Sequence, residues 1–510
     1  MSNLLFDPNA EGGHGNVWTE SKLLEVWDVI EKLAVKYGLK YNECDLVRVT
    51  QSEMLDLYVN NGLPEYPTHW TQGMDRESLE HKFSEGQMGL ALEIVVNTDP
   101  VQLYVMSNNT MTVQTMVLAH AGPGHGSFFK NNYLFKERTN ANSIRRYLRW
   151  ASNYIHRISL KYGDHEVSVW QNYAIALMWN SIDRYKRPRN MDRKRQEADL
   201  EWRLAQESSF DELNFEDNLN KENELSLRDF LDEEVFSKQF NEQDILHGDT
   251  EENLLYFLEK NSDSPKAMKE VFRIYRKIAE YFYPQKLTKI MNEGWASFWH
   301  YTLMYDLYDQ GYINDASMQE FIDYHCRVIN HIDSFEKLSN IPLFHHINPY
   351  TLGFYIFRDL RRVCEFPTPA DYKEFPDIAG TDWVSTLKHV AYNYKDSEFI
   401  LKFLSSKVIK DLKLYVITDD YSKDYIILSH AHTDLTYDGL KTIIAERLSF
   451  DYSHPQMYLH DYNPVNKSVK LSVVPYLNRS IMNEDTISAV SHFAEIWRPY
   501  ILEAGWVKQR

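Results

Sequence analysis

The run from Tyr281 to Tyr308 places ionisable side chains inside an otherwise aromatic and aliphatic helical pattern. Glu293 and His300 are seven residues apart, so they lie within about 20° of each other on one helix face. A carboxylate among apolar neighbours carries a desolvation cost unless a cation, a proton or a metal ion compensates it. The two residues therefore form either a hydrogen-bonded structural pair or part of a chemical site. Asn292 precedes Glu293, so the H-E-x-x-H pattern of zinc peptidases is absent and other ligands must come from elsewhere in the chain.

A second group of candidate ligands flanks the tripeptide Gly122-Pro123-Gly124. We predict a helix over 110–119, which Pro123 ends or sharply bends. His120 and His125 would then lie close together on a tight turn, where neutral imidazoles can bind one ion. The alternative is an exposed loop with two ordinary histidines. Further polar residues that we expect near this pocket are Lys130, Asn131, Asn132, His346 and Asn348.

We predict that these two segments meet and that His120, His125, Glu293 and His300 hold a divalent metal ion. Zinc is the expected ion, with manganese or iron as alternatives. Two imidazoles and a carboxylate leave room for a water molecule, which is the arrangement of hydrolytic zinc centres.

Four residues are candidates for catalysis beside this ion. Glu93 lies inside a predicted strand and would serve as a general base or support a ligand, although alternation alone favours a solvent-facing carboxylate. Tyrosine hydroxyls could stabilise an oxyanion. The candidates for that role are Tyr133, Tyr301 and Tyr350.

Hydrophobic periodicity predicts the elements that must position these residues. Tyr281–Tyr308 reads as one long helix with Pro284 in its first turn, and Asn348-Pro349 reads as the cap and first residue of another helix. A β-hairpin is expected from 91–96 and 102–106. Two further helices are predicted at 20–36 and 316–332.

Length and periodicity indicate a mainly α-helical protein with a small β-hairpin in a large N-terminal domain and a small C-terminal α+β domain. The main helical domain is predicted at 1–205 and 253–410, and the C-terminal domain at 411–510. Between the two parts of the main domain, 206–252 is an acidic linker or excursion, because fifteen of its residues from 210 onward are Asp or Glu.

Composition excludes several classes of protein. A formal charge of −19 argues against a general nucleic-acid binder and against attachment to anionic lipid. The three cysteines are far apart, which argues against a disulfide framework or a thiolate zinc site. No secretory signal pattern or apolar membrane-spanning window is present, so we expect a cytoplasmic protein that is not inserted in a membrane.

Four strings carry a resemblance to a known family: AHAGPGHGSFFKNNYLF, YFYPQKLTKIMNEGWASFWHY, INPYTLGFYIFRDLRR and FPDIAGTDW. Through them the chain resembles the SpoVR family, the stage V sporulation protein R-like proteins, over most of its length. The resemblance implies a role in spore cortex formation or in stress and starvation responses. It also implies a PrkA-like serine kinase and a von Willebrand-type protein as partners, but it names no reaction.

Three functions remain open from the sequence. The first is a metal-dependent hydrolase acting on a peptidoglycan-related or other amide-bearing substrate. The second is a non-enzymatic regulatory or scaffold protein that works with the kinase system. The third is an oxygen-using non-haem iron enzyme, since His and carboxylate ligands also suit iron.

Overall fold

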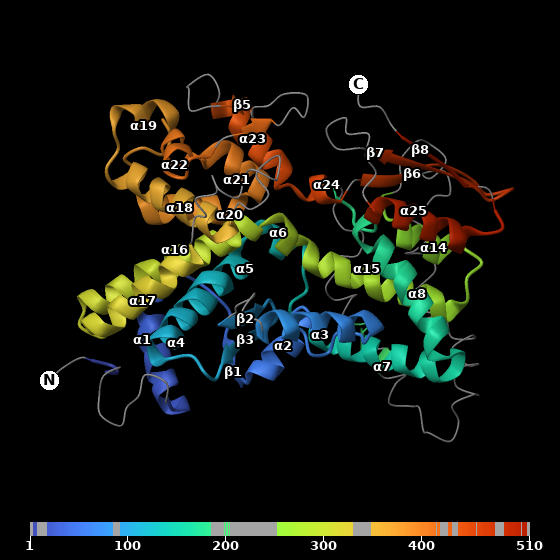
Figure 1. The fold of residues 1–510 in the computed structure, drawn as a ribbon, viewed down its shortest axis with the longest axis horizontal. Coiled ribbons are helices and arrows are strands. Elements are labelled where there is room, and N and C mark those ends of the chain that lie inside the picture. Colours follow the sequence, from blue (N-terminus) through green and yellow to red (C-terminus); the bar gives the residue numbers. More distant parts are fainter. Residues whose placement is uncertain are drawn as a thin grey trace. The chain divides into compact units, whose positions relative to one another are not determined.

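The computed structural model describes 4–7, 18–84, 92–184, part of 198–204, 252–329, 348–414, 416–418, 427–430, 437–454, 456–474, 484–500 and 502–506. Within these residues the protein is mainly helical, as predicted (Figure 1). No helix in this part of the chain is both long and apolar enough to cross a bilayer. The predicted acidic stretch 206–252, apart from Glu252, and the pocket candidate His346 lie outside the described residues.

Contacts between Cα atoms group the chain into two compact units. Unit 1 comprises Met1–Pro64, Asp75–Lys136 and Pro284–Phe450, and unit 2 comprises Glu65–Met74, Glu137–Tyr283 and Asp451–Arg510. This grouping does not show which part of the chain folds alone, so the predicted domain limits stay a prediction.

Unit 2 combines helices with a small sheet. Strand β7 pairs antiparallel with β6 and parallel with β8. Its elements are α7 (Ile144–Tyr162), α8 (Asp164–Leu177), a short 3-10 helix (Met178–Asn180), α14 (Leu254–Asn261), most of α15 (Lys266–Leu287), β6 (Gln456–Asn463), β7 (Ser468–Val474), α25 (Glu484–Trp497) and β8 (Leu502–Trp506).

Unit 1 holds all the predicted site residues that the structure describes. Its elements are α1 (Glu20–Lys36), β1 (Cys44–Val49), α2 (Gln51–Val59), β2 (Glu93–Val96), β3 (Val101–Met106), α4 (Met111–Ala119), η1 (His120–Gly126), α5 (Ser127–Asn131), α16 (Lys289–Asp309), α17 (Asp315–Val328), α18 (Pro349–Glu365), α19 (Pro369–Glu374), α20 (Trp383–Asn393), α21 (Asp396–Phe403), α22 (Ser406–Asp411), β4 (Val416–Thr418), β5 (Ile427–His430) and α23 (Tyr437–Arg447). Besides α15, the helices that cross the unit limits are α3 (Trp70–Ser84), α6 (Tyr133–Arg138) and α24 (Phe450–Ser453).

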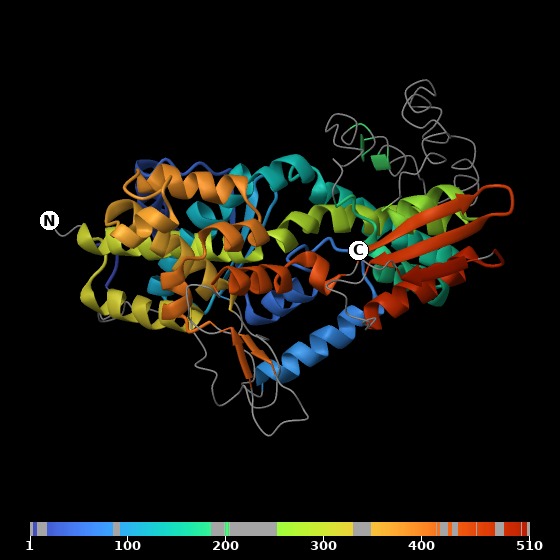
Figure 2. The ribbon, with the colours of Figure 1, turned by 90° about the horizontal axis from the view of Figure 1, so that it is seen from above.

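Helix α16 is the central element of unit 1, with α18 on one side and α4 on the other (Figure 1). Helix α17 folds back beside α16 (Figure 2). The side chains of Trp295, Phe298 and Trp299 on α16 are buried in a core that continues into α18 and α20. This core holds α16 in place. The same helix carries the ionisable residues Glu293 and His300.

The predicted hairpin is confirmed by β2 and β3, which pair antiparallel. A third strand, β1, pairs with β3 in parallel and was not predicted. The sheet order is β1-β3-β2, so β2, which begins with Glu93, lies at one edge.

The prediction of one helix over Tyr281–Tyr308 is wrong. Helix α15 ends at Leu287, Thr288 leaves the helical conformation, and α16 begins at Lys289. Pro284 therefore lies inside α15 near its end, where its missing N–H weakens the hydrogen-bond ladder. The buried carboxylate of Asp396 accepts hydrogen bonds from the main-chain nitrogens of Ile290 and Met291 at 2.8 and 2.9 Å, which stabilises a new helix start.

Candidate metal centre

The predicted tight turn at Pro123 is also wrong, because the chain continues through it as a wider helix. Helix α4 leads directly into η1, a π-helix over His120–Gly126, and then into α5. In an α-helix a proline ring clashes with the carbonyl four residues before it, whereas a π-helix bonds residues five apart, so the helix can continue through Pro123 although that residue donates no hydrogen bond. Residues five apart then lie one above the other, whereas an α-helix would turn them well apart. The rings of His120 and His125 accordingly meet edge to face with centroids 4.6 Å apart.

Small residues let η1 approach α16 closely. A Cβ atom added to Gly124 would lie 2.7 Å from the Cα atom of Ala296, and one added to Gly122 would lie 2.2 Å from the ring of Trp27. Both positions therefore require glycine in this packing. The contact brings the two imidazoles of η1 onto the face of α16 that carries Glu293.

A second close helix crossing brings α18 to the same place. A Cβ atom on Gly294 would lie 2.3 Å from Gly353, and one on Gly353 would lie 2.2 Å from the main-chain oxygen of Ile290. Helix α18 begins one turn before this crossing, with Asn348 accepting a hydrogen bond from the Tyr350 nitrogen at 2.9 Å. The crossing places the Tyr350 side chain beside Glu293, to which it forms a hydrogen bond.

Ligand atoms of His120, His125 and Glu293 all lie within 4.8 Å of one another. The Glu293 Oε2 atom is 3.4 Å from His125 Nε2 and 3.9 Å from His120 Nε2. Ligands at ~2.1 Å from a tetrahedral ion are roughly 3.4 Å from each other, so this group needs little movement to hold one.

The electrostatic environment of Glu293 also suits a cation. Its side chain is 18% exposed, and Oε2 is buried without a hydrogen bond of good geometry among the described residues. A buried carboxylate oxygen in that state is stabilised by a metal ion. Two nitrogens and one oxygen suit zinc, manganese or iron, so the donor set does not select the metal.

Glu93 stands next to this group as the first residue of β2. Its Oε1 atom is 3.7 Å from His120 Nε2, and its side chain is 17% exposed. Burial raises the pKa of Glu93 to about 7; the charge of His125 opposes the rise and that of Glu293 adds to it. Glu93 can therefore change protonation state near neutral pH.

The two histidines of η1 have opposite pKa shifts. Burial, together with the neighbouring His125, lowers the pKa of His120 well below its ordinary value. Burial also lowers the pKa of His125, but the Glu293 carboxylate more than offsets this, so the net shift is upward. For Tyr350, the Glu293 charge and then burial raise the pKa well above its ordinary value, so its hydroxyl keeps its proton.

Comparison with known proteins identifies the family. A family described as SpoVR like protein matches residues 17–452. The chain belongs to the SpoVR-like family. The chain is also similar to the uncharacterized protein YcgB of Escherichia coli strain K12, with 36% identity over 485 residues, covering 95% of this chain and 91% of that protein. No solved structure matches the chain.

His300, the predicted fourth ligand, makes a different set of contacts. Its Nδ1 atom lies 2.9 Å from His120 Nδ1, and its Nε2 atom lies 2.7 Å from His325 Nδ1. Both ring nitrogens therefore face other imidazoles, and His300 does not belong to the converging group. A ligand role for His300 stays a prediction.

Several of the predicted pocket residues hold the fold together around the site. Lys130 and Asn131 donate to the main-chain oxygens of Tyr41 and Lys40 at 3.0 and 2.8 Å. Asn132 is buried and donates to those of Ala391 and Tyr394. These described contacts do not include the metal group, and the binding roles of the three side chains stay predictions.

The remaining candidates occupy three places. Asn348 caps α18 and donates to the Val328 oxygen at 2.9 Å. Tyr133 begins α6. Tyr301 packs its ring against His325, with centroids 5.1 Å apart, and burial raises its pKa to about 12. Among the candidate tyrosines, Tyr350 is the one that bonds to a residue of the metal group.

Sequence reasoning missed two residues. His325 on α17 contacts His300, and Asn292 places its Oδ1 atom 2.9 Å from His125 Nδ1. Neither has a ligand-like spacing to its partner, since 25 and 167 residues separate the two pairs. The signal available for Asn292 was its place beside Glu293 on the same helix.

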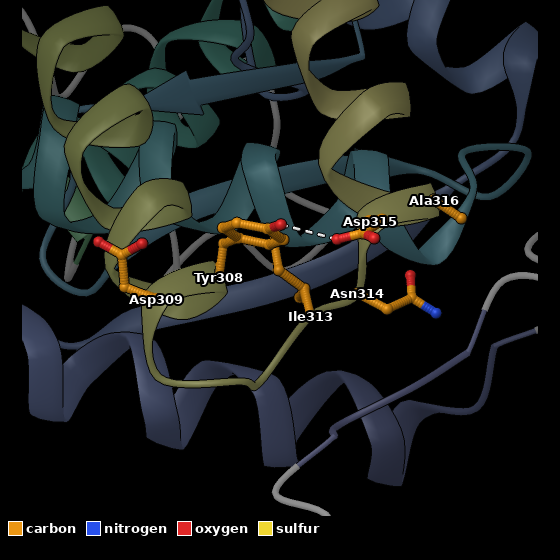
Figure 3. Close-up of a pocket in the computed structure, with 6 residues that line it drawn as sticks. All are labelled: Tyr308, Asp309, Ile313, Asn314, Asp315 and Ala316. Atoms are coloured by element: carbon orange, nitrogen blue, oxygen red, sulfur yellow. Dashed lines mark hydrogen bonds between the residues drawn. The ribbon is translucent and has the colours of Figure 1, made fainter.

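A hollow that contains none of these residues lies at the turn between α16 and α17 (Figure 3). It has a volume of about 730 Å³, and the Tyr308 hydroxyl donates to the Asp315 carboxylate there at 2.7 Å. It is open to solvent and contains none of the predicted site residues. Its lining is Tyr308, Asp309, Ile313, Asn314, Asp315 and Ala316.

Proposed function

We propose that this SpoVR-like protein is a metal-dependent hydrolase that acts on a peptidoglycan-related or other amide-bearing substrate, in spore cortex formation or a stress response. The observation that carries the proposal is the convergence of two imidazoles and one carboxylate with a buried, poorly satisfied oxygen. Zinc is the expected ion, with manganese and iron as alternatives.

The residues around the ion have complementary roles in this proposal. His120, His125 and Glu293 hold the metal through Nε2, Nε2 and a carboxylate oxygen. When bound, a divalent ion supplies an activated water near neutral pH and polarises a carbonyl oxygen. Glu93, whose Oε1 atom is 3.7 Å from His120 Nε2, accepts the proton of the attacking water and returns it to the leaving amine. Tyr350 keeps its hydroxyl proton and orients the Glu293 carboxylate.

Metal content is the first test. Protein purified without an affinity tag should contain about one equivalent of metal, and a chelator should lower its melting temperature. Free zinc at 100 times Kd should restore about 2.7 kcal/mol of stability. Glu293→Gln and His125→Ala should abolish both effects, whereas His389→Gln, which changes an exposed histidine of α20 in the same unit, should behave as wild type.

The reaction is tested separately with cell-wall fragments containing peptide amide bonds, with products identified by mass spectrometry. Metal-dependent cleavage that Glu93→Gln abolishes without loss of metal supports the hydrolase. Wild-type protein that binds no metal contradicts it. In that case a regulatory or scaffold role with a PrkA-like kinase and a von Willebrand-type protein is preferred, and co-purification of those partners tests it. Stoichiometric iron with oxygen consumption would instead indicate an oxygen-using iron enzyme.

A further inference from the structure

Three buried imidazoles form a continuous chain that starts at a proposed metal ligand. His120 lies on η1, His300 on α16 and His325 on α17, and each is at most 4% exposed. Nδ1 of His120 is 2.9 Å from Nδ1 of His300, and Nε2 of His300 is 2.7 Å from Nδ1 of His325. Both separations are those of hydrogen bonds.

Metal binding fixes the direction of this chain. A neutral imidazole has one N–H donor and one acceptor nitrogen. If His120 gives its Nε2 lone pair to an ion, its proton must be on Nδ1, so Nδ1 of His300 carries no proton and can accept this one; the ring also has a main-chain hydrogen bond to Ala296. The proton of His300 is then on Nε2 and is donated to Nδ1 of His325. The proton of His325 is left on Nε2, which is buried without a hydrogen-bond partner among the described residues.

The opposite direction gives His120 the wrong tautomer for a ligand. If His325 donated to His300 and His300 donated to His120, the proton of His120 would be on Nε2. That proton would face Glu93 Oε1 and Glu293 Oε2, at 3.7 and 3.9 Å from the nitrogen, and would block coordination. The direction of two hydrogen bonds therefore decides whether His120 can bind.

The other histidine ligand has a simpler partner with the same effect. Nδ1 of His125 lies 2.9 Å from the Oδ1 atom of Asn292. An amide oxygen only accepts, so His125 must carry its proton on Nδ1 and keep Nε2 free toward Glu293. Both histidines thus present Nε2 to the ion. The proton on Nδ1 of His125 is held by the amide of Asn292, and the proton on Nδ1 of His120 is held by the chain of His300 and His325.

We infer that His300 and His325 are positioning residues, which hold His120 in the tautomer that binds the metal through Nε2. This inference rests on the proposed metal centre and adds the residues that orient one of its ligands. Partners of this kind fix the tautomer and the ring orientation of metal-binding histidines. His325 is enclosed by the rings of Tyr301, Phe321 and Phe354, which holds the far end of the chain in place.

Zinc affinity measured against a chromophoric chelator tests the inference. His300→Leu should lower the affinity by about 10- to 100-fold, the range for loss of such a partner. His325→Leu should have a smaller effect, because it acts through His300. His325→Asn should restore affinity toward wild type, because its amide oxygen can replace the Nδ1 acceptor. Phe321→Leu is the matched control, since Phe321 packs on both rings without a hydrogen bond to either and should leave affinity close to wild type.

A spectroscopic measurement on the wild-type protein tests the inference without any variant. Long-range proton–nitrogen correlation spectra of histidine-labelled, zinc-loaded wild-type protein should show His120 and His125 protonated on Nδ1, and His300 and His325 protonated on Nε2. A His300 protonated on Nδ1 overturns the inference. So does a Phe321→Leu protein that loses as much affinity as His300→Leu, because packing would then explain both.

The two proposals fail in different ways. Wild-type protein that binds no zinc, manganese or iron removes the proposed metal enzyme and this inference with it. A metal-binding wild type whose affinity is unchanged by His300→Leu removes the inference alone. A metal-binding protein that shows the affinity differences but cleaves no amide substrate keeps the positioning chain and removes the hydrolase.

Discussion

Two buried carboxylates in this protein are compensated in different ways. In unit 2, Glu259 is 4% exposed at its side chain and is held by Arg273 at 2.6 Å, Lys260 at 3.0 Å and Arg276 at 3.3 Å. Burial alone would raise the pKa of Glu259, but these three cations lower it below its ordinary value. In unit 1, Glu293 has imidazoles, a tyrosine hydroxyl and a second carboxylate around it instead.

The difference indicates which site is built for stability and which for a ligand. At Glu259 the fold itself supplies permanent cations to the buried carboxylate. Around Glu293, neutral groups offset only part of the desolvation cost of the carboxylate, and its Oε2 atom is left without a good hydrogen bond among the described residues. A site of this kind is completed by a cation from solution, which is the basis for proposing a metal there.

The largest expected effect separates the two carboxylates directly. Glu259→Gln should destabilise the protein by up to about 3–5 kcal/mol, because the buried Arg276 guanidinium then keeps Glu280 but loses its other carboxylate partner. Glu293→Gln in metal-free protein should cost far less, because it removes a carboxylate from a site that contains another one. Urea unfolding in the presence of chelator measures both, with the exposed Glu80→Gln as control. Equal destabilisation by the two changes would mean that Glu293 is a structural residue.

The next effect is a pH dependence caused by Glu93. Its pKa is about 7 in the folded protein against an ordinary value of 4.5, so the folded state binds the proton more tightly than the unfolded state. The stability that this adds is present below pH 4.5 and is lost as the pH rises through 7, by up to about 3 kcal/mol.

Unfolding curves of metal-free protein between these pH values check this dependence. Asp396 also has a raised pKa of about 7, mainly through burial, and contributes with the same sign. The difference between wild type and Glu93→Gln therefore isolates the Glu93 part. If the two proteins show the same slope, Glu93 titrates normally and the proposed proton acceptor is not poised near neutral pH.

The sequence allowed much of the candidate site to be predicted, because its residues follow local rules. Glu293 was predicted because it shares a helix face with His300. His120 and His125 were predicted from the glycines and proline beside them. The Asn348 cap was predicted because a proline follows it. These signals depend on a few adjacent residues. The mainly helical fold and the β2–β3 hairpin were predicted for the same reason.

The features that the sequence did not reveal depend on distant parts of the chain. The break before α16 is stabilised by Asp396, more than 100 residues later. The π-helix at Pro123 is packed against Ala296 and Trp27 through two glycines, so its geometry is set by tertiary contacts. The link from His300 to His325 depends on how α17 folds back beside α16, which neither residue's spacing encodes.

The smallest expected effect concerns Tyr350, whose hydroxyl partly replaces a cation beside Glu293. Tyr350→Phe removes this hydrogen bond to a charged group and should destabilise metal-free protein by about 1.5–3 kcal/mol, at the lower end because the carboxylate is partly exposed. With saturating zinc the loss should shrink, because the ion then stabilises the same carboxylate. Tyr301→Phe on α16 is the matched control: Tyr301 hydrogen-bonds to Tyr305, so any cost should not depend on zinc. If zinc leaves the cost of Tyr350→Phe unchanged, the hydroxyl and the ion do not share Glu293, and the contrast with the permanently paired Glu259 no longer supports a metal at this site.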